Sequence, residues 1–285
     1  MFKIGVLVDS FRVGIDEGIE KARQAGVEGI QVYATYGEMA PENLTAARKR
    51  EILDRIESNG LVISALCGDL GGHGFMDAKE NEWKIEKSKR IMELAKELKT
   101  DVVTTHIGVV PEDEKDPVRE IMRKACDELA HFGDSIGASF AIETGPEKAL
   151  LLRQFLDSLT AKGVRVNMDP ANLVMVVGDD PVEAVKLLSP YIVHTHAKDG
   201  IMLNKDKSGN IYADNHALEH MGVSFVEMPL GKGDVNFPTY LKALRDIGYN
   251  GFLTIEREVG DNPEKDIREA VEFLNGVFKW GRFYV

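Results

Sequence analysis

The chain has 285 residues, of which 44% are hydrophobic and 29% charged, and its formal net charge is −12. This composition is typical of a globular protein with a large core, and the negative charge argues against nucleic acid or an anionic membrane as the main partner. Two cysteines, Cys67 and Cys126, are too few for a disulfide scaffold, so we expect reduced thiols in a cytoplasmic protein. The first residues lack a long apolar region with a cleavage site, so we expect no signal peptide, and because no apolar run of about 18 residues occurs we expect no membrane span.

Short apolar runs alternate with segments of helical periodicity along the whole chain. After the first run, Ile15, Ile19 and Ala22 recur at helical spacing until Gly26 ends the helix. The apolar runs predict strands over residues 4–8, 29–33, 61–66, 102–106, 139–143, 164–169, 192–198 and 252–256. Helices are predicted over residues 15–25, from Pro41 to Gly60, around 91–98, and from Pro117, Gly145-Pro146, Pro181, Pro238 and Pro263.

Eight strand-helix units in strict alternation require a parallel sheet with right-handed crossovers. Their number and the chain length predict an α/β protein, a closed (β/α)8 TIM barrel, as a single domain over residues 1–285. A doubly wound open sheet is the alternative, but residues 9–14 lack its glycine-rich fingerprint. Residues 200–233 are too long for a plain connection, so we expect this segment to be functional.

Active sites of such barrels lie at the carboxyl ends of the strands. Nearly every predicted strand ends in a polar or ionisable side chain that follows apolar residues. These side chains are Asp9, Tyr33, Asp69, His106, Glu143, Asp169, His196, Lys198, Glu256 and Glu258.

The alternation of side chains along a strand indicates which of these residues point into the barrel. Glu143 lies on the face opposite Phe140 and Ile142, and Asp169 and Glu256 alternate with bulky apolar neighbours in the same way. Inward carboxylates repel one another unless a positive charge lies among them. A divalent cation is the simplest such charge, and three carboxylates with one imidazole favour Mn²⁺, Mg²⁺ or Co²⁺ over structural zinc. The alternative is that each carboxylate merely caps the following helix.

The run Ile192-Val193-His194-Thr195-His196-Ala197-Lys198-Asp199 ends in a cluster of ionisable groups. His194, His196 and Lys198 share one face. His194 lies one layer deeper, so we expect it to be packed and hydrogen-bonded. We expect three other histidines, His131, His216 and His220, to lie at the surface. Lys198 and Asp199 could alternatively form an ion pair with each other, and we expect Glu258 to pair with Arg257 or Lys265.

Five motifs together resemble a known family. They are Ala-Ile-Glu-Thr-Gly at 141–145, Asn-Met-Asp-Pro-Ala-Asn at 167–172, His-Thr-His-Ala-Lys-Asp at 194–199, Leu-Gly-Lys-Gly-Asp-Val at 230–235 and Gly-Tyr-Asn-Gly-Phe-Leu-Thr-Ile-Glu at 248–256. The chain resembles the sugar isomerase/epimerase barrels that look like xylose isomerase, among them ketose 3-epimerases and inosose isomerases and dehydratases. The likeness spans the whole chain.

This resemblance implies one divalent cation, Mn²⁺ foremost and Mg²⁺, Co²⁺ or Zn²⁺ as alternatives, held by Glu143, Asp169, His196 and Glu256. It implies that the two glutamates also serve as acid and base, and that the chain forms dimers or tetramers. Ketose 3-epimerases have a histidine where this chain has Asn172, and an arginine where it has Met202. These differences argue against a free-ketohexose 3-epimerase, and the His-x-His-x-Lys-Asp run is closer to the keto-inositol enzymes.

We therefore expect a metal-dependent isomerase or epimerase that acts through an enediolate on a keto-sugar or keto-inositol. Glu143 and Glu256 are the predicted catalytic residues, while His106, Asn172, Lys198 and Asp199 are predicted to bind substrate. A dehydratase that eliminates a β-hydroxyl from the same substrate class is the alternative, and a non-catalytic sugar-binding barrel is a third hypothesis. Phosphodiester hydrolysis would require a histidine-rich zinc cluster and a DNA-binding surface, which seven histidines and a charge of −12 disfavour.

Overall fold

Eight parallel strands close into a barrel in the computed structural model of this chain, which describes residues 2–204 and 224–280. Around the barrel the strands follow the order β1, β10, β7, β6, β5, β4, β3, β2, and β2 pairs with β1 to complete the ring. The barrel strands are β1 (Lys3–Leu7), β2 (Gly29–Tyr33), β3 (Val62–Cys67), β4 (Val102–Thr105), β5 (Ser139–Glu143), β6 (Val164–Met168), β7 (Ile192–Ala197) and β10 (Phe252–Ile255). The predicted TIM barrel is confirmed.

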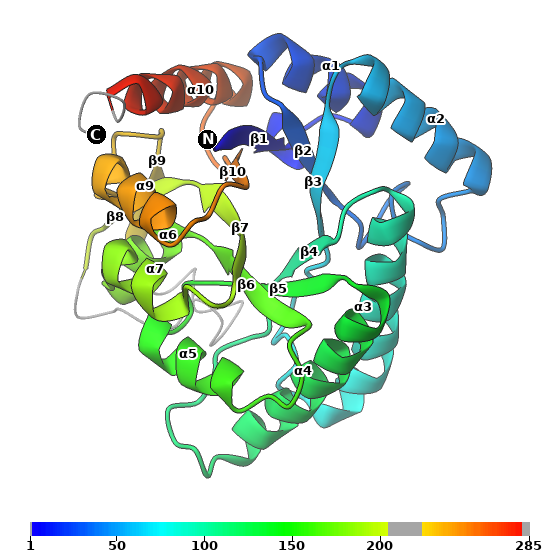
Figure 1. Ribbon diagram of the computed structural model, residues 1–285, viewed down its shortest axis with the longest axis vertical. Coiled ribbons are helices and arrows are strands. Elements are labelled where there is room, and N and C mark those ends of the chain that lie inside the picture. The colour runs from blue at the N-terminus through cyan, green and yellow to red at the C-terminus, as the bar shows by residue number, and fades with distance from the viewer. Residues whose placement is uncertain (1, 205–223, 281–285) are drawn as a thin grey trace.

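Helices surround the strands and cover the outward face of the barrel (Figure 1). They are α1 (Ile15–Ala25), α2 (Ala46–Ser58), α3 (Ala78–Glu97), α4 (Pro117–Ile136), α5 (Ala149–Asp157), α6 (Pro170–Asn172), α7 (Pro181–Leu188), α9 (Phe237–Asp246) and α10 (Pro263–Trp280). A 3-10 helix, η1 (Val8–Phe11), follows β1, and a π-helix, η2 (Leu173–Val177), continues α6. No helix within residues 2–204 and 224–280 is both long and apolar enough to cross a membrane.

Capping side chains explain where the helices begin. Asp116 and Asp180 accept hydrogen bonds from the second residue of α4 and α7, as predicted. The prediction that a helix begins at Pro41 is wrong, because α2 begins at Ala46, where the hydroxyl of Thr45 accepts a hydrogen bond from the Arg48 N–H at 3.2 Å. The side-chain cap therefore decides the start of this helix.

The chain turns tightly after β5, so α5 begins at Ala149 and not at the predicted Gly145-Pro146. Gly145 has φ of 134°, and a Cβ at this position would lie 2.2 Å from the Cβ of Asn172. A side chain here would collide with α6. The missing side chain of Gly145 thus allows Asn172 to approach the end of β5.

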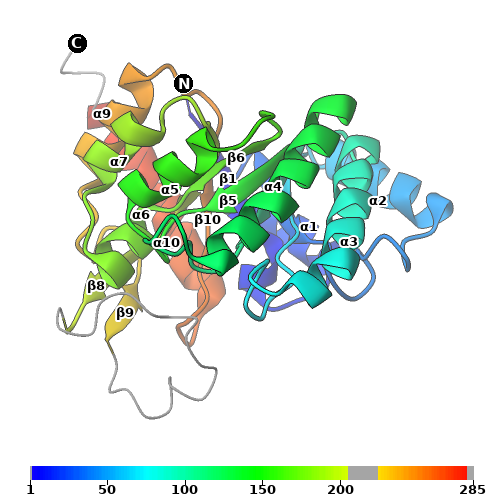
Figure 2. The ribbon, with the colours of Figure 1, turned by 90° about the horizontal axis from the view of Figure 1, so that it is seen from below.

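An antiparallel hairpin, which we did not predict, extends from one end of the barrel (Figure 2). Its strands are β8 (Asp199–Met202) and β9 (Phe225–Met228), with Asp199 opposite Met228. β9 lies within the long segment 200–233 and β8 begins one residue before it, and the functional role of this segment stays a prediction. Residues 205–223 lie outside the described part of the chain, and with them two of the three histidines expected at the surface, His216 and His220, whereas the third, His131, is exposed as expected.

Candidate active site

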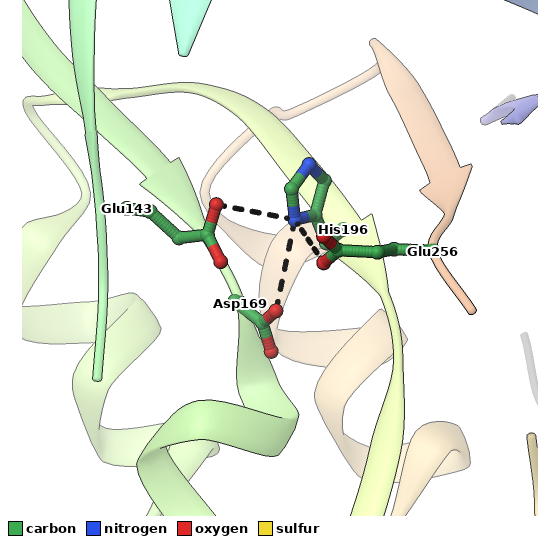
Figure 3. Close-up of side chains that lie close together, drawn as sticks. All are labelled: Glu143, Asp169, His196 and Glu256. Carbon is green, nitrogen blue, oxygen red and sulfur yellow. Dashed lines mark ion pairs between the residues drawn. The ribbon is translucent and has the colours of Figure 1, made fainter. Parts of the chain in front are cut away.

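Four ionisable side chains meet at the carboxyl ends of four consecutive barrel strands. Glu143 ends β5, Asp169 follows β6, His196 lies near the end of β7 and Glu256 follows β10. All four are buried, and their potential ligand atoms lie within 4.8 Å of one another. Figure 3 shows Glu143 and Glu256 reaching the imidazole from opposite sides. The structure thus brings together the four residues that were predicted to bind a metal.

Nδ1 of His196 is the atom that the three carboxylates share. It lies 2.9 Å from Oε2 of Glu256, 3.4 Å from Oε2 of Glu143 and 3.6 Å from Oδ2 of Asp169 (Figure 3). Burial lowers the pKa of His196, but Glu256 and Glu143 outweigh this effect and raise it well above its ordinary value. The cluster therefore attracts a positive charge at Nδ1, whether a proton or a metal ion.

The donor atoms fit a divalent cation. Oδ2 of Asp169 is buried and has no hydrogen-bond partner among the described residues, although it faces the other carboxylates. A buried carboxylate oxygen without a donor is costly unless a cation occupies its free side. Three carboxylates and one imidazole form an oxygen-rich set of the kind that suits Mn²⁺ or Mg²⁺.

Asp169 serves two purposes with its two oxygens. Oδ1 accepts hydrogen bonds from the backbone N–H groups of Ala171 and Asn172, at 2.8 and 3.0 Å, and so caps α6. Oδ2 remains directed at the cluster. Capping and metal binding, which we weighed as alternatives for this residue, are therefore compatible.

Glu143 is held by neutral hydrogen-bond donors and lies near a second histidine. The amide of Asn172 donates to its Oε1 at 2.9 Å and the amide of Asn167 to its Oε2 at 3.2 Å, while Nε2 of His106 lies 3.6 Å from Oε1. Burial raises the pKa of Glu143, but His196 and His106 overcome this effect and leave it below the ordinary value. Asn172 and His106 thus lie beside the cluster, and their substrate contacts stay predictions.

Lys198 is a buried cation among carboxylates. Its Nζ lies 3.3 Å from Oε2 of Glu256, 2.5 Å from Oε2 of Glu258 and 3.9 Å from Oε2 of Glu227. Burial lowers the pKa of Lys198, but Glu256 and Glu258 raise it well above its ordinary value. The group therefore carries a charge, and its predicted contact with substrate stays a prediction.

The expected partner of Glu258 is wrong. Glu258 pairs with Lys198 and not with Arg257, whose guanidinium contacts Glu227 at 2.6 Å and Asp266 at 2.8 Å. Glu227 lies on β9, a strand that we did not predict, so the sequence did not indicate Glu227 as the partner of Arg257. The hairpin thereby supplies a buried carboxylate next to the candidate site.

The carboxylate of Asp199 binds backbone N–H groups, a role that we did not predict. Its Oδ1 accepts from the backbone N–H groups of Gly200 and Val235, and its Oδ2 from those of Gly231 and Gly233, at 2.9 to 3.1 Å. These contacts involve both carboxylate oxygens, and the predicted contact of Asp199 with substrate stays a prediction. It anchors residues 231–235 to the start of β8, and it forms no ion pair with Lys198.

A polar layer lies beneath the cluster inside the barrel. His194 is packed as expected, with Nδ1 2.9 Å from Oδ1 of Asn167 and Nε2 3.0 Å from Oγ1 of Thr254. Gln31, which our sequence analysis did not single out, lies 3.1 Å from Nε2 of His196 through its Oε1. Its only signal in the sequence was an uncharged polar residue inside an apolar strand.

Comparisons with known proteins agree on one family. The family model described as "Xylose isomerase-like TIM barrel" matches residues 19–277. An uncharacterised protein of Methanocaldococcus jannaschii, MJ1311, is 26% identical over 250 residues, which are 82% of this chain and 73% of that protein. A solved xylose isomerase domain protein from Planctomyces limnophilus superposes with a TM-score of 0.81 at 25% identity, covering 98% of this chain and 97% of that one.

Two solved structures of lower identity share the fold. The probable 3-DHS dehydratase AsbF of Bacillus anthracis has a TM-score of 0.76 at 19% identity and covers 96% of this chain and 99% of its own. A D-tagatose 3-epimerase-like protein superposes with a TM-score of 0.75 at 18% identity, and the match covers 99% of this chain and 98% of that protein. The same fold therefore carries proteins named for different reactions.

Proposed function

The chain belongs to the family of xylose isomerase-like TIM barrels, and we propose that it is a divalent-metal-dependent isomerase or epimerase acting on a keto-sugar or keto-inositol. The observation that carries this proposal is the pair Glu143 and Glu256, which approach one buried point from opposite sides (Figure 3). A reaction that removes a proton from one face of a carbon and returns one to the opposite face calls for a proton-transferring group on each side.

Glu143, Asp169, His196 and Glu256 would hold the cation, and Mn²⁺ is our first choice for this oxygen-rich set. When bound, the cation supplies the positive charge that polarises a carbonyl group and stabilises the enediolate formed after proton loss. The side chains of the site bind the substrate and transfer the protons.

One of the two glutamates removes the carbon-bound proton, and the other returns a proton. Return to the same carbon on the opposite face gives the epimer, and return to the neighbouring carbon gives the isomer. The ammonium of Lys198 lies close enough to Glu256 to hold this carboxylate ionised and in place. His106, on the other side, lies beside Glu143, where we propose that it contacts a substrate hydroxyl.

A dehydratase is the second candidate, and Lys198 is the observation that favours it. Loss of a β-hydroxyl from the enediolate requires a proton donor near the departing oxygen. The buried ammonium has three N–H groups, and it is positioned beside one of the two proposed acid-base residues. The probable dehydratase AsbF shares the fold, although at 19% identity it supports nothing beyond the fold.

Solvent deuterium exchange tests the proposal and separates the reactions. Mn²⁺-loaded protein would be incubated in D₂O with a panel of ketoses and keto-inositols, and the small molecules would then be separated and observed by NMR. We expect deuterium at one carbon of a substrate, with an epimer, an isomer or a dehydrated product identifying the second half-reaction.

Matched variants tie the exchange to the site. Glu143→Gln and Glu256→Gln each remove one acid-base group while retaining the side-chain shape, so we expect exchange to fall by at least about 100-fold. Asp180→Asn, at a helix cap away from the cluster, is the control. Absence of exchange on the whole panel, or full activity of the Glu256→Gln protein, would contradict the proposal.

A further inference from the structure

Gln31 contacts a candidate metal ligand across the interior of the barrel. It lies in β2 with 1% of its surface exposed, and its Oε1 is 3.1 Å from Nε2 of His196 in β7. These strands are not neighbours in the barrel, so the contact spans the interior. A shift in the pairing of β2 with β3 between Ile30 and Gln31 breaks the regular register at this point, and such irregularities redirect side chains.

A second contact fixes the orientation of the Gln31 amide. Its Nε2 donates to Oγ1 of Thr104 at 2.9 Å, and the Thr104 hydroxyl points to the carbonyl oxygen of Leu66 at 3.5 Å. The nitrogen of the amide therefore faces Thr104, and the oxygen faces His196. Since a carbonyl oxygen only accepts hydrogen bonds, Nε2 of His196 must carry the hydrogen.

The location of this hydrogen decides what the other ring nitrogen can do. In a neutral imidazole only one nitrogen carries a hydrogen, and the other has a free lone pair. With Nε2 donating to Gln31, the lone pair is on Nδ1, the atom that faces Glu143, Asp169 and Glu256.

A hydrogen bond from Asn167 could instead favour the form of His196 that carries its hydrogen on Nδ1. Its Nδ2 lies 3.2 Å from Nε2 and 3.5 Å from Nδ1 of His196, and donation to Nε2 would move the hydrogen to Nδ1. The same Nδ2 also lies 3.2 Å from Oε2 of Glu143. One N–H of this amide is directed to the Glu143 carboxylate, the stronger acceptor. The second N–H is not aligned with a ring lone pair, because Nδ2 is almost equally far from both ring nitrogens and so lies over the ring, whereas the lone pairs lie in its plane. Gln31 therefore decides which ring nitrogen carries the hydrogen.

We propose that Gln31 is a positioning residue that selects the Nε2–H form of His196 and thereby presents Nδ1 to the metal. The inference rests on the proposed function, because it concerns a proposed metal ligand. Partners of this kind, in contact with a ligand and not with the metal, orient the imidazole and strengthen its binding. Thr104 supports Gln31 by holding its amide in the required orientation.

Metal affinity is the first test, measured by calorimetric titration of the protein with Mn²⁺ alone. We expect Gln31→Leu to bind Mn²⁺ about 10- to 100-fold more weakly. Gln31→Glu, which keeps an acceptor for Nε2–H, should restore the affinity at least in part. Asn81→Leu is the matched control, because it replaces another buried amide, which donates to Phe75 O, with no atom near His196. Its affinity should equal that of the unmodified protein.

NMR of protein labelled with ¹⁵N in histidine is the second test. In the unmodified protein, metal-free or loaded with diamagnetic Mg²⁺, we expect a slowly exchanging Nε2–H signal from His196, and we expect it to exchange faster in Gln31→Leu. If Gln31→Leu does not fold, Thr104→Val provides the same comparison, because the amide is then free to rotate.

The outcomes separate this inference from the proposed function. Unchanged Mn²⁺ affinity and an unchanged Nε2–H signal in both Gln31→Leu and Thr104→Val would overturn the positioning role while the metal site stands. An unmodified protein that binds no Mn²⁺ would overturn the metal-dependent function and this inference with it, and the Nε2–H signal of the metal-free protein would then report only whether Gln31 accepts a hydrogen bond from His196.

Discussion

The Nζ of Lys198 lies 3.3 Å from Oε2 of Glu256, the same oxygen that lies 2.9 Å from Nδ1 of His196. One carboxylate oxygen is thus shared between a permanent cation and a proposed metal ligand. Burial raises the pKa of Glu256, but Lys198 and His196 overcome this effect and lower it far below the ordinary value. The carboxylate remains ionised inside the barrel because these two neighbours compensate for lost solvation.

Removing the ammonium should therefore damage both folding and function. We expect Lys198→Met to lower the free energy of unfolding by about 3–5 kcal/mol, since it leaves buried carboxylates without their cation. We expect deuterium exchange into substrate to fall at least about 100-fold. Lys198→Arg keeps the charge and should be less harmful in urea unfolding. A Lys198→Met protein with unchanged stability and exchange would show that the pair is incidental.

The two tasks of Asp169 can be separated by a single substitution. Asp169→Asn keeps an oxygen that caps α6 and replaces only the oxygen that faces the cluster. Mn²⁺ at 100 times its dissociation constant should stabilise the unmodified protein by about 2.7 kcal/mol. We expect Asp169→Asn to fold and to lose this stabilisation, as observed by thermal unfolding with and without Mn²⁺. Asp180→Asn, the same change at the cap of α7, should retain it.

Glu147 should make stability depend on pH. Its carboxyl is buried, its Oε2 accepts from the Val110 N–H at 3.2 Å, and burial raises its pKa from 4.5 to about 7. Because the folded form binds this proton more tightly, the group stabilises the protein fully below pH 4.5 and loses this contribution as the pH rises through about 7. The loss amounts to about 3 kcal/mol.

Glu147→Gln removes the titration and keeps the hydrogen-bond acceptor. The difference in unfolding free energy between the two proteins should therefore change by about 3 kcal/mol between pH 4.5 and pH 8, with the variant favoured at high pH. Urea unfolding at several pH values provides the measurement. Parallel stability curves for the two proteins would contradict the argument.

Substitutions of Asp199 should lower the free energy of unfolding, by an amount that depends on how many of its hydrogen bonds they remove. Its two oxygens accept hydrogen bonds from four backbone N–H groups, so Asp199→Ala leaves four donors, two of them on the buried residues Gly200 and Val235, without this partner. We expect the free energy of unfolding to fall by about 2–4 kcal/mol, and by less in Asp199→Asn, which retains one oxygen. Hydrogen exchange should rise first at residues 231–235. If exchange there stayed as slow as in the unmodified protein, Asp199 would not be their anchor.

The strand ends were the most predictable part of this protein. Side chains alternate strictly between the interior and the helices, so Glu143, Asp169 and Glu256 could be assigned to the inside from their apolar neighbours alone. Position along the strand separated His194 from His196, since both share one face and His194 lies one layer deeper. The barrel followed from the repeated strand-helix order, and its closure is confirmed.

What could not be predicted depends on contacts between distant parts of the chain. Gln31 acts on His196 across the barrel, 165 residues away in sequence, and nothing in its own strand indicates this partner. Glu227 and Asp199 acquire their roles from the β8–β9 hairpin, whose strands are too far apart in the chain to show a turn signal. The helix predicted from Pro41 begins instead at Ala46, where the hydrogen bond between the Thr45 hydroxyl and the Arg48 N–H fixes its start.

The continuity of β7, Lys198 and β8 has a consequence for protein engineering. Only one residue separates the barrel strand that carries His196 from the hairpin strand that begins at Asp199. A chimaera joined directly after β7 would therefore exchange Lys198 and the anchor of residues 231–235 along with the hairpin. Junctions placed at Leu203 and Ser224, where the two backbones meet at 2.8 Å, would keep both. The segment between these junctions can then be exchanged without rebuilding the proposed catalytic centre.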